Sequence, residues 1–339
     1  MINFEVIIGI EVHTVLNTKT KMFSPAKNDH HSEPNTNVNV IDLGLPGVMP
    51  QPNKAAIKKG IWLAKELEME IDYKNICFDR KNYFYIDLPK GFQITQQHHP
   101  IGKDGKLKTP LQDVFIERIH LEEDTAKQFS KDHKIYLDYN RCGAPLIEIV
   151  TTPCMHSADQ AMAYLSTLKQ VLQFNNISDA KMEDGSLRAD VNISLRPYGV
   201  KAYGTKVEIK NINSISNVGK AIEYEIMRQQ ALLLENKPVL QETRRFDDKT
   251  MQTVHMREKT DAVSYRYIFE PNILRIQLPE EEFEKIIHEK PESLKSLKEK
   301  LATLGFKEKE IELLVNDYEL YKAFKTLNEM GADPLNAFK

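Results

Sequence analysis

Apolar and polar residues alternate strictly through residues 187–196, and this alternation constrains the fold more than any other feature of the chain. The apolar positions are Leu187, Ala189, Val191, Ile193 and Leu195. Successive side chains of a β-strand point to opposite faces. The segment is therefore predicted to form a strand with one buried face and one polar face, as in an antiparallel sheet.

Three helical segments interrupt the strand-like part of the chain. The first follows Pro52-Asn53, the second begins with the capping box Ser157-Ala-Asp-Gln160, and the third runs from about Ser216 to Asn236. Another alternating strand is predicted over residues 206–210. Together these patterns predict an α+β fold, in which a largely antiparallel sheet carries flanking helices.

The composition changes near Pro279, after which the chain is rich in Lys, Glu and Leu. Leucines recur there at helical spacing, at Leu294, Leu297, Leu301 and Leu304. A chain of 339 residues suits two domains at about 100–200 residues per domain. We place the first domain over residues 1–285 and the beginning of an all-helical domain over residues 286–339.

The bulk composition argues against a disordered chain and against a protein that holds nucleic acid through an excess of positive charge. Apolar residues make up 41% of the chain and the net charge is −3, so a folded core is expected and any contact with nucleic acid must be local. The cysteines Cys77, Cys142 and Cys154 are scattered, which favours a reducing compartment. The sequence shows no targeting segment and no long apolar stretch. We expect a cytoplasmic protein, or one of an organellar matrix if the source is eukaryotic, without a membrane span.

Charged residues interrupt several otherwise apolar strands. Glu148 lies in the apolar segment 145–150, and Glu11 and His13 flank Val12 on one strand face. A solvated face of an antiparallel sheet explains each strand taken alone. A buried, unpaired carboxylate is costly, however, so the recurrence of such residues requires a second interpretation.

Acids and histidines dominate these polar faces. Alternation also places His120 with Glu122, and Asp190 with Asn192. If the faces converge, a divalent cation would offset the repulsion between carboxylates, and oxygen-rich ligands without thiolates indicate Mg²⁺ or Mn²⁺. The candidate ligands are Glu11, His13, Glu122, Glu148 and Asp190. The solvated face and the metal site both remain open from spacing alone.

The sequence lacks the common nucleotide and hydrolase motifs. It has no P-loop, no G-x-G-x-x-G, no H-E-x-x-H and no G-x-S-x-G. Cys142 is interpreted as a small buried thiol, because no ordered histidine or acidic relay accompanies it. The chain therefore shows no machinery that would release ammonia from glutamine. Cationic residues near the acids suit a transferring phosphoryl group or are ordinary surface charges: Lys81, Lys90, Arg188, Lys206 and Lys210.

The densest basic stretch follows the third helix. Its cations are Arg244, Arg245, Arg257, Lys259 and Arg266. Because Tyr265, Tyr267 and Phe269 are interleaved with them, the stretch suits phosphate contacts and base stacking. A solvated edge strand is the alternative.

Several long motifs resemble those of one family, the B subunits of aspartyl/glutamyl-tRNA amidotransferases, from Phe4 to about Asp333. They are Gly9-Ile-Glu-Val-His13, Ile41-Asp-Leu-Gly-Leu-Pro-Gly47, Phe78-Asp-Arg-Lys-Asn-Tyr-Phe-Tyr85, His120-Leu-Glu-Glu-Asp124, Pro145-Leu-Ile-Glu-Ile-Val150, Met182-Glu-Asp-Gly-Ser-Leu-Arg188, Asn192-Ile-Ser-Leu-Arg-Pro-Tyr198, Lys206-Val-Glu-Ile-Lys-Asn211 and Glu242-Thr-Arg-Arg-Phe246.

The resemblance implies a fold and a function. It implies a cradle domain similar to glutamine synthetase and guanidino kinases, followed by a helical domain. Such a chain would bind Glu-tRNA(Gln), Asp-tRNA(Asn) or both, and phosphorylate the attached side-chain carboxylate with ATP and Mg²⁺, or Mn²⁺. Ammonia from a glutaminase A subunit would then give Gln-tRNA(Gln) or Asn-tRNA(Asn), within a heterotrimer completed by a small C subunit.

The resemblance also assigns individual residues. The catalytic and metal-binding positions are Glu11, His13, Glu122, Glu148 and Asp190. The expected ATP or acyl contacts are Lys81, Lys90, Ser186, Asn192, Lys206, Glu208 and Lys210. The expected tRNA contacts are Arg244, Arg245 and Arg266.

The chain departs from the family pattern in places. The family usually reads Asp-Tyr-Arg-Tyr-Phe-Pro-Glu-Pro-Asp where this chain has residues 264–272, and Asn-Arg-Gln-Gly-Thr-Pro where it has residues 140–145. The C-terminal tail domain of typical members is absent, so we expect a fragment or a shortened form. Two other interpretations remain: a degenerate, non-catalytic tRNA-binding or assembly subunit, and an ATP-dependent ligase that acts on a small acid.

Overall fold

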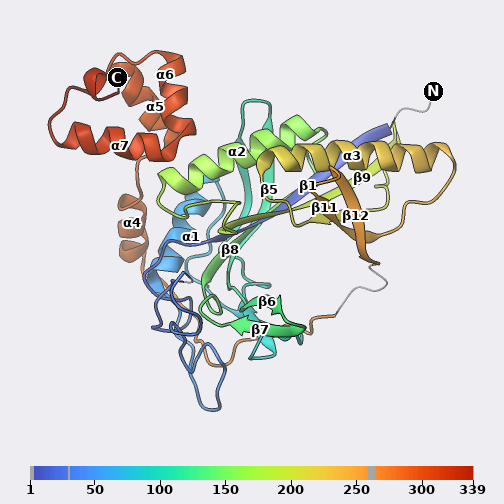
Figure 1. The fold of residues 1–339 in the computed structure, drawn as a ribbon. Helices are drawn as coiled ribbons and strands as arrows, with labels where there is room; N and C mark the ends of the chain where they lie inside the picture. Colours follow the sequence, from blue (N-terminus) through green and yellow to red (C-terminus); the bar gives the residue numbers. More distant parts are fainter. Residues whose placement is uncertain (1–3, 30, 259–263, 339) are drawn as a thin grey trace.

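The computed structural model in Figure 1 describes residues 4–29, 31–258 and 264–338. Within these residues the strands form an eight-stranded sheet, a three-stranded sheet and a two-stranded hairpin. Helices lie above the large sheet in this view, and the hairpin lies below it. The two faces of the large sheet therefore have different surroundings.

The large sheet follows the order β12-β11-β10-β9-β1-β8-β5-β4. Its strands are β1 (Phe4–Val15), β4 (Gly102–Lys108), β5 (Asp113–Glu123), β8 (Pro145–Thr151), β9 (Leu187–Pro197), β10 (Val207–Lys210), β11 (Glu242–Asp247) and β12 (Gln252–Glu258). Neighbouring strands are antiparallel, except that β10 and β11 are parallel. The predicted strands at 187–196 and 206–210 are β9 and β10. The prediction of a mixed fold with a large, mostly antiparallel sheet is confirmed, whereas the likeness to glutamine synthetase and guanidino kinases stays a prediction.

Three helices cover one face of this sheet and match the predicted helical segments. They are α1 (Lys54–Glu66), α2 (Ala158–Phe174) and α3 (Ile215–Leu234). Side chains at their N-caps accept hydrogen bonds from backbone N–H groups of the first turn, as Ser157 does from Gln160 in α2. The apolar side chains of the helices and of the alternating strand positions form one continuous core. Burial of this face leaves the opposite face of the sheet for polar residues.

The three-stranded sheet lies against the end of β5. Its strands are β2 (Asp79–Asn82), β3 (Phe92–Thr95) and β13 (Ile268–Phe269), in the order β13-β2-β3. The backbone N–H of Ile94 donates to Oε1 of Glu123 at 3.0 Å, and Gln96 accepts at Oε1 from the N–H of Leu121 at 2.9 Å. These bonds fix the small sheet beside the polar face of the large one.

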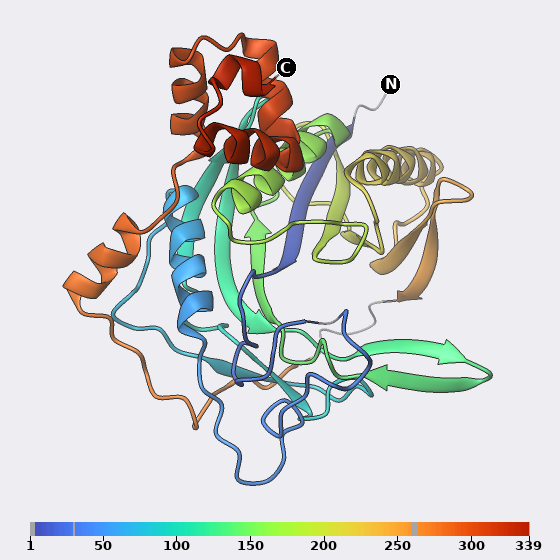
Figure 2. The same cartoon turned by 60° about the vertical axis from the view of Figure 1, so that its left-hand side comes forward.

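The hairpin of β6 (Lys127–Lys131) and β7 (Lys134–Asp138) projects from the body, as Figure 2 shows. Asp132 and His133 at its tip both have positive φ, which a two-residue turn of this hand requires. Asp138 anchors its base, because the carboxylate accepts from the N–H groups of Asn35 and Asn140, each at 3.0 Å.

The C-terminal helices form a second, smaller core. They are α4 (Glu280–His288), α5 (Leu294–Thr303), α6 (Glu308–Asn316), α7 (Tyr318–Glu329) and α8 (Pro334–Phe338). Phe283 and Ile286 of α4 pack on the first core, whereas the second core combines Phe174 with side chains from Leu294 onward. The proposed boundary between residues 285 and 286 therefore falls inside α4, and the division into domains stays a prediction. No helix among the described residues has the length and apolar character needed to cross a membrane.

Candidate functional site

The polar face of the large sheet brings the predicted acids together. Directly paired residues of antiparallel strands point to the same face, and the register pairs Glu11 with Asp190, His13 with Glu148, and Glu148 with His120. Strands β9, β1, β8 and β5 therefore carry their polar residues in one continuous row. The alternation seen in the sequence thus places all of these side chains on the side away from α1, α2 and α3.

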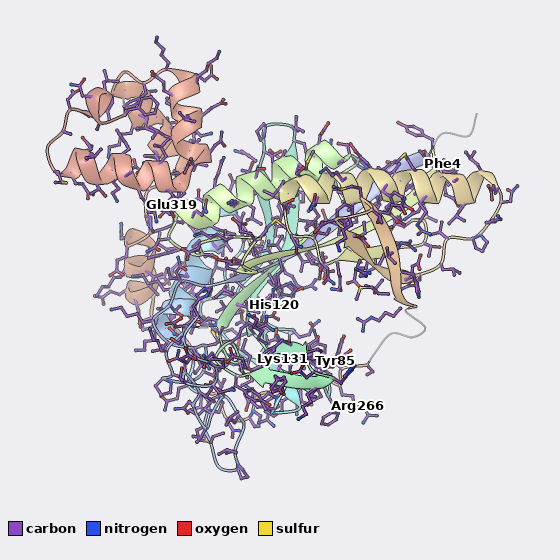
Figure 3. All side chains as sticks on the ribbon, in the orientation of Figure 1. Phe4, Tyr85, His120, Lys131, Arg266 and Glu319 are labelled. Atoms are coloured by element: carbon purple, nitrogen blue, oxygen red, sulfur yellow. The ribbon has the colours of Figure 1, made fainter. Side chains whose placement is uncertain are left out.

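His13, Glu122 and Glu148 form a first group of possible metal ligands. One ligand atom from each of the three side chains lies within 4.8 Å of the other two. Nε2 of His13 is 3.5 Å from Oε1 of Glu122 and 3.5 Å from Oε2 of Glu148. His120 adjoins the group, because its Nε2 lies 2.8 Å from Oε2 of Glu148. Figure 3 shows His120 near the middle of the molecule, between the helices above and the small sheet and hairpin below.

A second group consists of Glu11, Asp190 and Glu208, also within 4.8 Å of one another. Nζ of Lys210 forms an ion pair with Asp190 and lies 3.4 Å from Oε1 of Glu208. Asn192 donates through Nδ2 to Oε1 of Glu11 at 3.0 Å. The five predicted ligands are thus divided between two neighbouring groups rather than gathered in one.

Burial and neighbouring charges together shift the pKa values of these groups. Burial opposes the protonation of His120, but Glu148 and Glu122 outweigh it and raise its pKa to about 9. The two histidines in turn hold the pKa of Glu148 well below its usual range, despite burial. Burial and the charges of Glu148, Asp190 and Glu208 raise the pKa of Glu11. Ionisation of Glu11 is therefore unfavourable unless a cation lies beside it.

The donor atoms fit a hard divalent cation. Both groups offer carboxylate oxygens, the first adds an imidazole nitrogen, and neither includes a thiolate. Oδ1 of Asn192 is buried without a hydrogen-bond partner in the described part of the chain, and it belongs to the residue whose Nδ2 donates to Glu11. An amide oxygen is a ligand that Mg²⁺ and Mn²⁺ accept. The metal assignment of the five predicted residues nevertheless stays a proposal.

His120, which adjoins the first group, and Glu208, a member of the second, were not predicted as ligands. His120 shares a strand face with Glu122, and this alternation was visible in the sequence. Glu208 was assigned to ATP or acyl contacts, and it joins Glu11 only because β9 lies between β10 and β1. Thr243 donates its hydroxyl hydrogen to Oε2 of Glu208 at 2.9 Å, which orients that carboxylate.

The other predicted contact residues lie at varied distances from the two groups. Lys90 is buried in an ion pair with Glu123, and Ser186 closes a turn through hydrogen bonds with Lys181. Lys206 lines a cavity of about 320 Å³ together with Glu11 and Asn192. Lys81 lies on the small sheet, with its Nζ 4.7 Å from the ring centre of Tyr265. Their roles toward ATP or an acyl group stay predictions.

The basic stretch has two kinds of arginine. Arg244 is held internally, because it donates to Thr253 and to Oε1 of Glu242 at 2.8 Å each. Arg245 and Arg266 are exposed. Their contact with tRNA stays a prediction for all three, and Lys259 lies outside the described residues.

Cys142 is buried, as the sequence predicted for a simple packing thiol. Burial and the carboxylate of Glu123 raise its pKa to about 12. A thiol that stays protonated is a poor nucleophile. The residue therefore gives this chain no means of hydrolysing glutamine.

Comparison with known proteins identifies similar chains. The profile of a family described as "GatB/GatE catalytic domain" matches residues 6–284. The B subunit of the aspartyl/glutamyl-tRNA(Asn/Gln) amidotransferase of Ureaplasma parvum serovar 3 is 54% identical over 344 residues, covering 100% of this chain and 72% of the relative. The B subunits of the same name are 56% identical in Malacoplasma penetrans, covering 96% and 68%, and 51% identical in Mycoplasma pneumoniae, covering 100% and 72%.

Proposed function

The chain belongs to the family of aspartyl/glutamyl-tRNA amidotransferase B subunits, and on this premise we propose that it activates a carboxylate of misacylated tRNA. ATP would phosphorylate the side chain of Glu-tRNA(Gln), Asp-tRNA(Asn) or both. Ammonia would then displace phosphate to give the amide. The reaction is that of a glutamine-hydrolysing ligase, to which this chain contributes the activation and transamidation steps.

One observation carries the proposal: two acidic groups lie side by side on the polar face of one sheet. Phosphoryl transfer requires positive charge around the phosphate oxygens and little covalent chemistry from the protein. Bound there, Mg²⁺ would offset the phosphate charge and polarise the transferring group. His13, Glu122 and Glu148 would hold one ion, and Glu11, Asp190 and Glu208 would hold the other.

The chain's own cations complete the charge balance. Lys210 lies between Asp190 and Glu208, and Arg188 pairs with His13 in the register and binds Asp124 at 3.0 Å. Both cations lie on the acidic face and would attract a phosphate group once the acids hold Mg²⁺. Phosphorylation removes the negative charge of the substrate carboxylate, which otherwise repels a nucleophile, and supplies a leaving group.

The ammonia would come from a partner. The buried, protonated Cys142 offers no glutaminase nucleophile, so we propose that an amidase-type A subunit supplies ammonia and that a small C subunit completes the heterotrimer. A degenerate, non-catalytic role is less well supported, because such a protein would have no need to keep six ligand atoms in two compact groups. A ligase for small acids would differ in turning over without RNA.

Glu148→Gln tests the proposal, since the amide keeps the size of the side chain and removes its charge. In the complex reconstituted with the A and C subunits, we expect loss of ADP formation that depends on Glu-tRNA(Gln) or Asp-tRNA(Asn), by about 100-fold or more. Mn²⁺ binding followed by electron paramagnetic resonance should weaken in parallel. Asp113→Asn is the matched control, because Asp113 lies at the exposed end of β5. Unchanged turnover in Glu148→Gln would refute the assignment, and turnover of free glutamate without RNA would favour the small-acid ligase.

A further inference from the structure

Four tyrosines form a continuous row on the small sheet and the segments beside it. Successive ring centres are 6.0 Å apart from Tyr85 to Tyr83, 5.9 Å from Tyr83 to Tyr265, and 6.0 Å from Tyr265 to Tyr267. Each pair meets edge to face, at interplanar angles of 65–73°. We call Tyr85, Tyr83, Tyr265 and Tyr267 the tyrosine row.

The strand register directs this row toward the acidic groups. In the small sheet Asp79 pairs with Thr95 and Lys81 with Gln93, so these residues share one face. The hydroxyl of Thr95 lies 3.4 Å from Oε2 of Glu122, which shows that this face looks toward the first acidic group. Nζ of Lys81 lies 4.7 Å from the ring centre of Tyr265 and 5.8 Å from that of Tyr83, so the row borders the same face.

Tyr267 and Tyr85 are the two ends of the row. Burial, Tyr265 and the charges of Glu148 and Glu122 raise the pKa of Tyr267 to about 12, and burial and Glu122 likewise raise the pKa of Tyr83, so both rings lie on the side of the acids. At the other end Nη1 of the exposed Arg257 donates to the hydroxyl oxygen of Tyr85 at 3.4 Å. Figure 3 shows Tyr85 and Arg266 below His120, on the side away from the helices that cover the large sheet.

The backbone holds this arrangement in place. Asn82 donates its backbone N–H to the carbonyl of Tyr265 at 3.0 Å and its Nδ2 to the carbonyl of Arg266 at 2.7 Å. Arg266 adopts a φ of 44°, an uncommon left-handed conformation for a residue with a side chain. The segment is thus fixed by specific hydrogen bonds, although its backbone geometry is unfavourable.

The rings remain available for a ligand. Tyr85 is exposed, and Tyr83, Tyr265 and Tyr267 are only partly buried. Among the described residues, no hydrogen bond engages the hydroxyls of Tyr83, Tyr265 or Tyr267. Partly exposed aromatic rings with neighbouring Lys and Arg side chains are the combination that binds single-stranded nucleic acid, through stacking of bases and attraction of phosphates.

We propose that the tyrosine row binds the unpaired bases at the 3′ end of the substrate RNA and leads the attached acyl group to the acids. This inference rests on the proposed function, because only an RNA that carries the reacting carboxylate needs such a track. Four rings at a regular spacing exceed what the single adenine of ATP occupies. The face that the row borders looks toward Glu122, and there the terminal nucleotide would place its acyl group.

Binding of a hairpin RNA with an unpaired 3′ tail tests the proposal, with a blunt-ended form of the same hairpin as reference. The full chain is titrated without ATP or divalent metal, and affinity is read from fluorescence anisotropy. We expect Tyr83→Ala and Tyr265→Ala each to weaken binding of the tailed RNA about tenfold, and to leave the blunt RNA unaffected. Tyr83→Phe and Tyr265→Phe keep the aromatic face and should bind within about twofold of the wild type.

A second readout does not depend on any variant. A 2-aminopurine base in the tail should lose fluorescence when the wild-type chain binds, because stacking on tyrosine quenches it. Equal affinity for tailed and blunt RNA, absence of quenching, or displacement of the tail by ATP alone would each overturn the proposal. Thermal melting confirms that the alanine variants are folded. The binding assay contains neither ATP nor metal, so its outcome does not depend on carboxylate activation. The activity test with Glu148→Gln can therefore refute the proposed function without refuting the tyrosine row, and the binding assay can refute the row alone.

Discussion

Glu11 and Asp190 lie directly opposite each other on strands β1 and β9, and both carboxylates face the same side of the sheet. Like charges in this position destabilise a sheet by about 0.2–1 kcal/mol. Lys210 relieves the crowding in part, through its ion pair with Asp190. The pKa of Glu11 is raised by burial and by Glu148, Asp190 and Glu208, so its ionised form opposes folding at neutral pH.

Glu11→Gln should therefore stabilise the metal-free chain. The sign follows from the raised pKa: folding favours the protonated acid, and this contribution is lost as pH rises through the folded-state pKa. We expect the melting temperature in EDTA at pH 7 to rise by about 1–3 °C, which corresponds to less than about 1 kcal/mol. Mg²⁺ should stabilise the wild type more than the variant. A lower melting temperature of the variant in EDTA would contradict the charge-crowding account.

Lys90 and Glu123 form a buried ion pair, with side chains only 6% and 2% exposed. Lys90→Met should cost about 3–5 kcal/mol, because it leaves the Glu123 carboxylate buried without its cation. The double variant Lys90→Met with Glu123→Gln should recover much of this loss, since the amide still accepts from the N–H of Ile94. Urea denaturation of the two single variants and the double variant measures the coupling. Additive losses would show that the pair does not act as a unit.

The sequence allowed the polar strand faces to be predicted but not the way they assemble. Alternation placed Glu11 with His13 and Asp190 with Asn192, because side-chain direction within a strand is a local property. The grouping of Glu208 with Glu11 depends on strand order, which packing against α3 and the pairing of β9 with β1 determine. The buried pairing of Lys90 depends likewise on the docking of β3 against β5. Such contacts join residues distant in sequence, so periodicity carries no information about them.

Arg244 and Arg245 are adjacent on β11 but point to opposite faces, so replacing them with alanine should have different effects. Arg244→Ala removes hydrogen bonds to Thr253 and Glu242 and should lower stability by about 2 kcal/mol, because buried partners lose a charged donor. Arg245→Ala should change the free energy of unfolding by no more than about 0.5 kcal/mol. It should weaken tRNA binding to a similar degree for all RNA sequences, and the slope of log affinity against log salt concentration should fall by about one. Urea denaturation and filter binding at several salt concentrations separate the two effects. Unchanged RNA affinity in Arg245→Ala would remove that residue from the proposed tRNA contacts.

Glu242 of β11 forms an ion pair with Arg228 of α3, and we expect this pair to make the stability of the chain depend on pH. Oε1 of Glu242 lies 3.2 Å from Nη2 of Arg228. Burial alone would raise the pKa of Glu242, but hydrogen bonds and charges from His255, Arg244 and Arg228 outweigh it, so the pKa is lowered. A lowered pKa contributes stability above the unfolded value near 4.5, and this contribution is lost as pH falls through the folded-state pKa. Glu242→Gln should therefore destabilise the chain by about 2 kcal/mol at pH 7, and the difference from the wild type should shrink steadily below about pH 4.5. Glu235→Gln, at the exposed end of α3, is the control and should show no such trend. A constant difference between wild type and Glu242→Gln from pH 7 to pH 3 would show that the loss comes from packing rather than from the charge of the carboxylate.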